Sequence, residues 1–159
     1  MGVKNETIRR SLATFQGVEH RLEYVATIRG VRYINDSKGT NTDSTIKAVQ
    51  SMRLPTVMIL GGYDKHVTFR PLAAEIQKTP LIRHCVLIGA TAAQLEKELA
   101  EAGYTAITHA KTLKEAVNLC RDMTEEGNNV LFSPACASFD MFEDYEQRGR
   151  IFKQLVNQL

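Results

Sequence analysis

The chain has 159 residues, of which 43% are hydrophobic and 24% are charged, and its formal net charge is +2. This length suits one domain with a sizeable core, and the composition is that of a folded globular protein rather than a disordered chain. The small net charge, without a run of basic residues among aromatic ones, argues against binding to nucleic acid or to a membrane surface.

The sequence also indicates the cellular compartment. Its longest apolar runs, such as TVMIL at 56–60, are far too short to span a bilayer, and the opening MGVKNETIRRSL lacks the apolar centre of a secretory signal. Cys85, Cys120 and Cys136 have no Cys-x-x-Cys spacing, and the histidines have no i, i+4 partner. We therefore expect a cytoplasmic monomer with reduced thiols and no metal site.

The first predicted element is a short helix at 5–14, with Ile8, Leu12 and Phe15 on one face. A linker with the sequence QGVEHR follows it. A fold rarely begins on a lone helix followed by a linker, so this helix reads as the end of a preceding unit.

A hairpin and a second helix come next. The runs RLEYVATI and VRYIND flank an Arg-Gly pair at 29–30, which predicts a tight antiparallel turn between two strands. Helical spacing then covers 42–52, where Thr42 is a suitable N-cap and Ile46 and Val49 face inward.

From residue 56 onward, apolar strands alternate with amphipathic helices. The expected strands lie at 56–62, 85–90 and 129–133, with a weaker one at 105–110, and the expected helices lie at 69–78, 91–102 and 112–126. Two helices open with possible capping boxes, Thr91 with Gln94 and Thr112 with Glu115. Strands that are apolar throughout need cover on both faces, so we predict a Rossmann-like three-layer α/β domain, with a mostly parallel sheet and an N-terminal antiparallel hairpin.

Polar loops follow three of the strands. In open α/β sheets, ligands bind beyond the carboxyl ends of the strands, so these loops should share one rim. A single lysine there is usually only solvated, a serine is usually a cap, and Cys136 is more often a buried filler than a nucleophile. Two lysines and several hydroxyls on one rim nevertheless suit a ligand with two carboxylates. The rim residues are Lys38, Thr40, Lys65, Ser133 and Ser138.

Two phosphate-binding motifs are missing from the sequence. There is no G-x-x-x-x-G-K-[ST] P-loop, and no G-x-G-x-x-G follows a strand. The rim can therefore hold an anion but lacks the residues that would activate a nucleotide.

The segments HRLEYV, INDSKGTN, GGYDK and SPACASFDMFEDYEQRG closely resemble the C-terminal domain of the Mur ligases, in particular the branch that adds D-glutamate. The resemblance covers essentially the whole chain, and the Asp-Asn-Pro-Arg motif expected of the meso-diaminopimelate branch is absent. It implies that residues 1–15 are the tail of a central ATPase domain and that residues 16–159 form the C-terminal domain.

The resemblance implies an ATP-dependent amide ligase of peptidoglycan synthesis. In that family, ATP phosphorylates the carboxylate of UDP-N-acetylmuramoyl-L-alanine, and the amine of D-glutamate then attacks the acyl phosphate. The P-loop and the Mg²⁺ ligands lie in the central domain, and the UDP site lies in the N-terminal domain. The present chain would bind D-glutamate, close over ATP and be inactive alone.

The resemblance also implies roles for individual residues. Lys38 would be the catalytic residue, because it adds positive charge near the reacting phosphate. Contacts to the nucleotide would come from Arg21, Asp36 and Asn41. The family often has Phe where this chain has Tyr145. Contacts to D-glutamate would come from Thr40, Lys65, Ser138, Phe139 and Tyr145.

Other readings of the sequence remain open. A stand-alone α/β module that binds small anions would show measurable ligand affinity on its own. A domain of a folylpolyglutamate synthase-like ligase would also add glutamate, although the SPACASFDMF segment argues against it. A receiver-type signalling domain lacks its acidic pair and its phosphoacceptor aspartate here.

Overall fold

The computed structural model describes residues 5–6 and 17–159. The helix predicted at 5–14 and the domain boundary predicted after residue 15 lie almost entirely outside these residues. Within the described part of the chain, no helix is long and apolar enough to cross a membrane.

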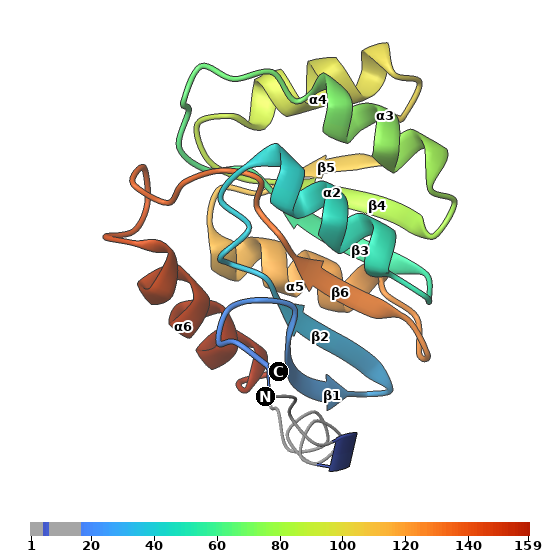
Figure 1. Ribbon diagram of the computed structural model, residues 1–159, viewed down its shortest axis with the longest axis vertical. Helices are drawn as coiled ribbons and strands as arrows, with labels where there is room; N and C mark the ends of the chain where they lie inside the picture. Colours follow the sequence, from blue (N-terminus) through green and yellow to red (C-terminus); the bar gives the residue numbers. More distant parts are fainter. Residues whose placement is uncertain (1–4, 7–16) are drawn as a thin grey trace.

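A six-stranded sheet with the order β1-β2-β6-β3-β4-β5 organises the fold (Figure 1). β1 and β2 pair antiparallel, and each remaining pair of neighbours is parallel. This arrangement confirms the predicted fold class. The strands are β1 (Glu23–Ile28), β2 (Val31–Asn35), β3 (Thr56–Leu60), β4 (Ile82–Leu87), β5 (Ile107–His109) and β6 (Asn129–Phe132).

The β1–β2 hairpin turns at Arg29 and Gly30, as predicted. Both residues have a positive φ, 50° and 75°, which is the requirement of a type I′ turn. This turn suits two strands that twist in the right-handed sense, so the short connection sets the register of the hairpin.

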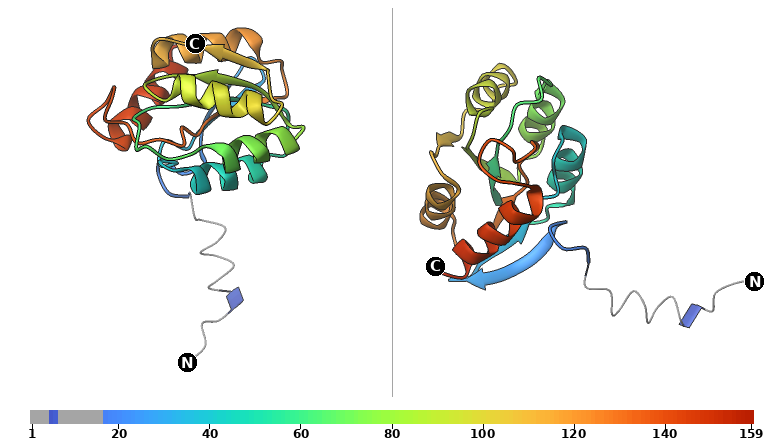
Figure 2. Two further views of the ribbon diagram at one scale, coloured as in Figure 1. Left: turned by 90° about the horizontal axis from the view of Figure 1, so that it is seen from above. Right: turned by 90° about the vertical axis from the view of Figure 1, so that its left-hand side faces the viewer.

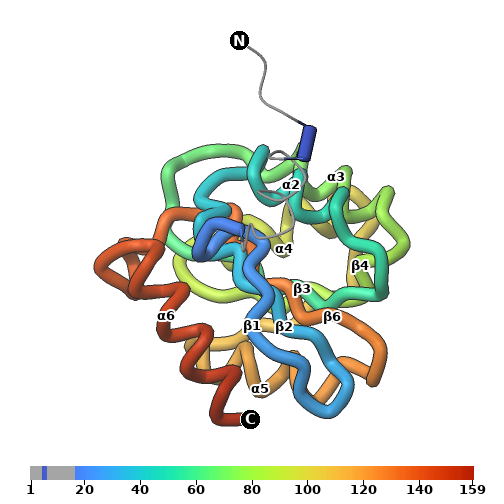
Figure 3. Tube along the Cα trace, turned by 60° about the horizontal axis from the view of Figure 1, so that its bottom comes forward, coloured from blue at the N-terminus to red at the C-terminus, as the bar shows by residue number. Residues whose placement is uncertain are grey.

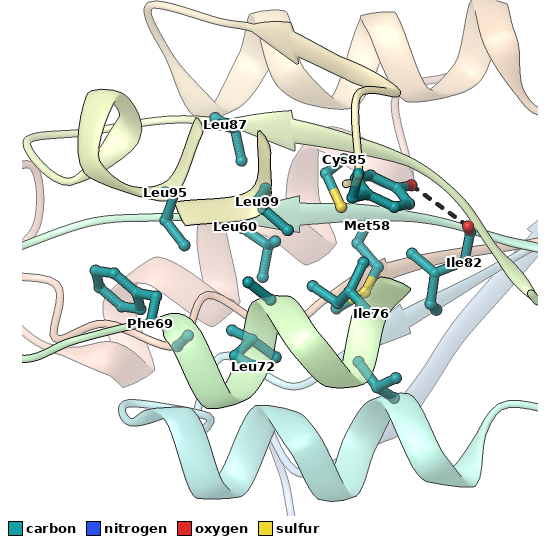
Figure 4. Packing of buried hydrophobic residues seen from close by; sticks show 14 of the residues in the cluster. Met58, Leu60, Phe69, Leu72, Ile76, Ile82, Cys85, Leu87, Leu95 and Leu99 are labelled. Carbon is teal, nitrogen blue, oxygen red and sulfur yellow. Dashed lines mark hydrogen bonds between the residues drawn. The ribbon is translucent and has the colours of Figure 1, made fainter. Parts of the chain in front are cut away.

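Helices cover both faces of the sheet (Figures 1 and 2). One face carries α2 (Thr42–Ser51), α3 (Arg70–Lys78) and α4 (Ala92–Glu101), and the other carries α5 (Leu113–Met123) and α6 (Tyr145–Val156). Figure 4 shows the first core, in which side chains of α3 and α4 face side chains of β3 and β4. The labelled contacts include Leu72, Ile76, Leu95, Leu99, Met58, Leu60, Cys85 and Leu87.

Three elements differ most from the sequence prediction: β4, α5 and α6. α5 ends at Met123 rather than at 126. β4 begins at Ile82 rather than at Cys85, because exposed Arg83 breaks the apolar run at its start. The sequence pattern predicts no helix at α6, because the polar first turn of this helix continues the polar loop that follows β6. α6 runs beside the hairpin strands and brings its N-terminus to the rim (Figure 3).

The structure confirms one predicted helix cap in part and contradicts two. Thr112 caps α5, because its hydroxyl accepts from the Glu115 N–H at 3.1 Å. The predicted capping box is only half formed, because the Glu115 carboxylate accepts from the Lys111 N–H rather than from the Thr112 N–H. The N-cap of α2 is Asn41 rather than Thr42, since its side-chain oxygen accepts from the Ser44 N–H at 2.9 Å. Thr91 precedes α4 but makes no capping bond, because its hydroxyl is used elsewhere.

Candidate functional site

The candidate site lies at the carboxyl ends of β3 and β6. These strands are parallel neighbours, but β3 leads to α3 on one face and β6 leads to α6 on the other. The chain therefore departs in opposite directions, which is the topological switch point where α/β domains bind ligands. The loops at 61–69 and 133–144 line this point, and the loop at 36–41 after β2 lies beside it.

Asp36 is fully buried at this edge. Its Oδ2 accepts from Ser133 Oγ at 2.7 Å, and its Oδ1 accepts from the Leu22 N–H at 3.2 Å and from Arg21 Nη1 at 3.4 Å. Burial raises the pKa of the carboxyl group, and the bonds from Ser133 and Arg21 oppose this shift. The structure thus brings together Arg21 and Asp36, two of the three residues for which the resemblance implies nucleotide contacts.

Lys38 and Tyr145 lie next to each other. Lys38 Nζ is 5.5 Å from the centre of the Tyr145 ring, within the range of a cation–π interaction. The Tyr145 carbonyl accepts from the Ser37 hydroxyl at 2.7 Å, so the start of α6 is tied to the turn after β2. A phenylalanine at position 145 would keep both contacts.

Arg148 is the main site residue that sequence reasoning missed. It is fully buried and donates from Nε to Ser37 Oγ at 3.0 Å, from Nη2 to the carbonyls of Ser37 and Cys136 at 2.8 and 3.0 Å, and from Nη1 to the Ala137 carbonyl at 3.0 Å. Burial lowers its pKa to about 10, so the guanidinium is still charged at neutral pH. It therefore joins the loop after β2 to the loop after β6.

A signal for Arg148 was present in the sequence. Arg148, Phe152 and Val156 recur at i, i+4 and i+8, and all three are buried in α6. Had the segment been read as a helix, this spacing would have placed an arginine on the apolar face, where a charge needs several hydrogen-bond partners.

His20 and Asn35 form a second buried pair near the rim, which sequence reasoning also missed. Asn35 Nδ2 lies 2.9 Å from His20 Nδ1, and its Oδ1 accepts from the Ser37 N–H at 3.1 Å. An amide nitrogen can only donate, so His20 Nδ1 must be the acceptor and the imidazole is neutral. Burial lowers the pKa of His20 in agreement with this assignment. The His20 carbonyl accepts from the Lys38 N–H at 2.9 Å.

The loops that carry Lys65 and Ser138 lie side by side. The Tyr63 N–H donates to the Ala137 carbonyl at 3.0 Å, and the Tyr63 and Phe139 rings meet edge to face at 5.9 Å. Lys65 is exposed, and Ser138 is buried. In the described part of the chain, neither the Lys65 ammonium nor the Ser138 hydroxyl has a hydrogen-bond partner.

The other predicted site residues differ in how they are engaged. Thr40 is half-buried, and its N–H donates to the Lys38 carbonyl at 2.9 Å. Asn41 already uses one lone pair of its side-chain oxygen as the cap of α2, and its amide NH₂ remains available to donate to a nucleotide. Phe139 is 65% exposed.

Cys136 is not a nucleophile in this site. It is buried and free, and burial raises the pKa of its thiol to about 11, so the thiolate is scarce at neutral pH. The prediction of a buried filler is confirmed. Among the residues that the structure describes, no group of three or more His, Cys, Asp or Glu could hold a metal ion.

These features define a class of protein: a Rossmann-like domain with lysine and hydroxyl side chains on the loops at the switch point of its sheet. Residues 20–136 match the family described as "Mur ligase, glutamate ligase domain". The chain belongs to this family.

Relatives of known name support a narrower similarity. The chain is 47% identical over 158 residues to a UDP-N-acetylmuramoylalanine--D-glutamate ligase of Caldicellulosiruptor bescii, and 47% identical over 160 residues to the ligase of that name from Koribacter versatilis. These matches cover 99% of this chain but 34% of each relative. The chain therefore spans about a third of the length of these relatives.

Solved structures share the fold. The UDP-N-acetylmuramate-alanine ligase of Thermotoga maritima matches 94% of this chain and 32% of its own, with a TM-score of 0.65 at 16% identity. A bifunctional folylpolyglutamate synthase/dihydrofolate synthase from Yersinia pestis matches 98% of this chain and 35% of its own, with a TM-score of 0.69 at 13% identity. At such low identities, both likenesses concern the fold alone.

Proposed function

We propose that this chain is the C-terminal domain of an ATP-dependent ligase that adds D-glutamate to UDP-N-acetylmuramoyl-L-alanine in the cytoplasm. The observation that carries the proposal is the 47% identity, over 99% of this chain, to ligases of that name. Residues 1–15 would be the tail of a central ATPase domain, and residues 16–159 the C-terminal domain. ATP and Mg²⁺ would be held mainly by the parts of the enzyme outside this chain.

In this proposal, the rim at the carboxyl ends of β3 and β6 binds D-glutamate. The Lys65 ammonium, the Ser138 hydroxyl and Thr40 would bind its two carboxylates, with Phe139 and Tyr145 along the wall. The support is that Lys65 and Ser138 come from adjacent loops and that neither is engaged within the described residues. Charge-assisted hydrogen bonds to carboxylates are the strong kind, so a few of them suffice for orientation.

Lys38 would act on the reacting groups rather than on the substrate carboxylates. Its ammonium, held beside the Tyr145 ring, would offset the negative charge that develops on the phosphoryl group and on the tetrahedral oxygen. Arg21, paired with buried Asp36, and the amide of Asn41 would contact the nucleotide. Presenting the amine close to the acyl phosphate would add the rate advantage of orientation.

The fold likeness to folylpolyglutamate synthase does not favour that alternative. Its identity is 13%, whereas the named D-glutamate ligases reach 47%. No contact at the rim favours a folylpolyglutamate synthase over a D-glutamate ligase.

The proposal is tested by Lys65→Ala in the complete ligase. Loss of one or two charge-assisted bonds, at about 1.5–3 kcal/mol each, should raise the KM for D-glutamate roughly ten- to a hundredfold. The control is Lys78→Ala, which removes an exposed lysine at the C-terminal end of α3, away from the rim. A KM for D-glutamate that stays at the wild-type value in Lys65→Ala would refute the proposed substrate site.

A further inference from the structure

Three polar side chains of the α4 region are turned toward one loop. Thr91, Gln94 and Glu98 are spaced i, i+3 and i+7, so they share a face, and all three contact the loop at 62–69 that links β3 to α3. Figure 1 shows this loop passing the N-terminal end of α4. Polar residues of an amphipathic helix usually face water. Three polar side chains that instead bond to one loop indicate that the position of this loop matters.

Thr91 is hydrogen-bonded to Gly62 at the first end of the loop. The Gly62 carbonyl accepts from the Thr91 N–H at 3.1 Å and from Thr91 Oγ1 at 3.2 Å, while the Gly62 N–H donates back to Oγ1 at 3.1 Å. The protonated thiol of Cys136 lies 3.3 Å from the same oxygen and can donate to it. The hydroxyl then uses its one proton and both lone pairs, which is why it does not cap α4.

Gln94 and Glu98 hold the other end. Gln94 Nε2 donates to the Val67 carbonyl at 2.9 Å and to Glu98 Oε1 at 2.8 Å. Glu98 Oε2 accepts from the Phe69 N–H at 2.6 Å and from the Thr68 hydroxyl at 3.0 Å. Burial acts to raise the pKa of Glu98, but these hydrogen bonds outweigh it and lower the pKa, so the side chain is a carboxylate.

Gly62 fixes how closely this loop approaches the next one. Its φ is 153°, and a Cβ there would lie 2.5 Å from the Ala137 carbonyl oxygen. Only a glycine allows this contact with the loop that carries Ser138. The loop at 62–69 is thus anchored at both ends, and exposed Lys65 stands between the anchors.

We propose that Thr91, Gln94 and Glu98 are positioning residues that hold the loop at 62–69 so that Lys65 faces a substrate carboxylate beside Ser138. This inference rests on the proposed function for the role of Lys65. An anchored loop has less conformational freedom to lose when the ligand binds, and it keeps the ammonium in a productive place.

The first test measures steady-state kinetics of the complete ligase. Thr91→Val keeps the shape of the side chain but removes the hydroxyl, and it should raise the KM for D-glutamate about fivefold or more while kcat changes less than about twofold. Thr91→Ser should restore the wild-type KM. The control is Thr112→Val, which removes the cap of α5 and costs stability without touching the loop. If Thr112→Val raises the KM as much as Thr91→Val does, a general loss of stability explains the effect and the proposal is wrong.

The second test measures amide hydrogen exchange in this chain and needs no substrate. Exchange should become about tenfold faster or more at the Gly62 N–H in Thr91→Val, which removes the acceptor of that N–H. It should become faster at the Phe69 N–H in Gln94→Ala, which removes a hydrogen bond to Glu98, and the strands should be unchanged in both variants. Gln94→Ala serves if Thr91→Val does not fold. Unchanged exchange in the variant would show that these side chains do not anchor the loop. Faster exchange with an unchanged KM in the same variant would refute the positioning role. If Lys65→Ala itself left the KM unchanged, the proposed substrate site would fail, while the exchange result would still decide whether the anchor exists.

Discussion

Replacing Arg148 by methionine tests whether a buried guanidinium holds the ligand loops together. Arg148 supplies hydrogen bonds to Ser37 Oγ and to three carbonyl oxygens, those of Ser37, Cys136 and Ala137. The Ala137 carbonyl also accepts from the Tyr63 N–H, so it would keep a partner. Among the described residues, the carbonyls of Ser37 and Cys136 would be left without one.

The size of the effect follows from these contacts. Each buried acceptor that loses its partner costs about 1–3 kcal/mol, so two of them give roughly 2–6 kcal/mol. The guanidinium is itself desolvated, as its lowered pKa of about 10 shows, and removing it relieves part of that penalty. We therefore expect a net loss of about 3 kcal/mol in the free energy of unfolding. For a chain of this size, that corresponds to a Tm lower by roughly 6–12 °C.

The assay is thermal unfolding of this chain followed by circular dichroism. Arg150→Met is the matched control, because Arg150 lies on the same helix but is exposed, with only a 3.8 Å ion pair to Glu146. Its Tm should change by less than about 2 °C, as surface ion pairs contribute little. Arg148→Lys should lower the Tm nearly as much as Arg148→Met does, because a single ammonium group cannot bond to all four oxygen atoms at once. A Tm for Arg148→Met equal to that of Arg150→Met would refute the reasoning.

Three further predictions concern this chain alone. It should release no phosphate from ATP above a heat-denatured control, because its sequence has no P-loop. It should bind D-glutamate at about 1 mM or more weakly, since the loss of translational freedom consumes most of the gain from a few hydrogen bonds. NMR shifts confined to 36–41, 62–66 and 133–146, with L-glutamate as control, would support this, whereas micromolar binding would favour a stand-alone module. Its stability should fall as the pH drops below about 6.5, because burial lowers the pKa of His20 and the unfolded chain takes up the proton first. In His20→Gln, this fall between pH 7.5 and 5.5 should shrink, and an unchanged slope would contradict the assignment.

The sequence predicts the sheet and the rim well because both rest on simple patterns. Apolar strands must be covered on both faces, and β3 and β6 are buried throughout. The polar stretches after β2, β3 and β6 then fall at the same edge of the sheet without any knowledge of side-chain contacts. The hairpin turn follows from one glycine that accepts a positive φ.

The details that the sequence could not supply all involve side chains with a choice of partner. The Thr91 hydroxyl could cap its own helix or bind Gly62, and only the tertiary structure decides between them. Thr42 and Asn41 are both capable caps, and the chain direction before α2 selects Asn41. Arg148 was missed for a different reason. The first turn of α6 is polar, so the sequence pattern does not indicate that a helix begins there.

A division among the polar side chains of the rim supports the proposed site. Asp36 and Arg148 are bonded to other parts of the protein and hold the loops in place. Lys65 and the Ser138 hydroxyl have no hydrogen-bond partner within the described residues, and Lys38 faces only the ring of Tyr145. A buried polar network whose members are hydrogen-bonded makes the loops around it rigid. Side chains that were only solvated would not need rigid loops, so the network indicates that the positions of these groups matter. In the proposal, the groups that this network positions are the Lys65 ammonium and the Ser138 hydroxyl, which would bind a carboxylate of D-glutamate, and the Lys38 ammonium, which would lie near the reacting phosphoryl group.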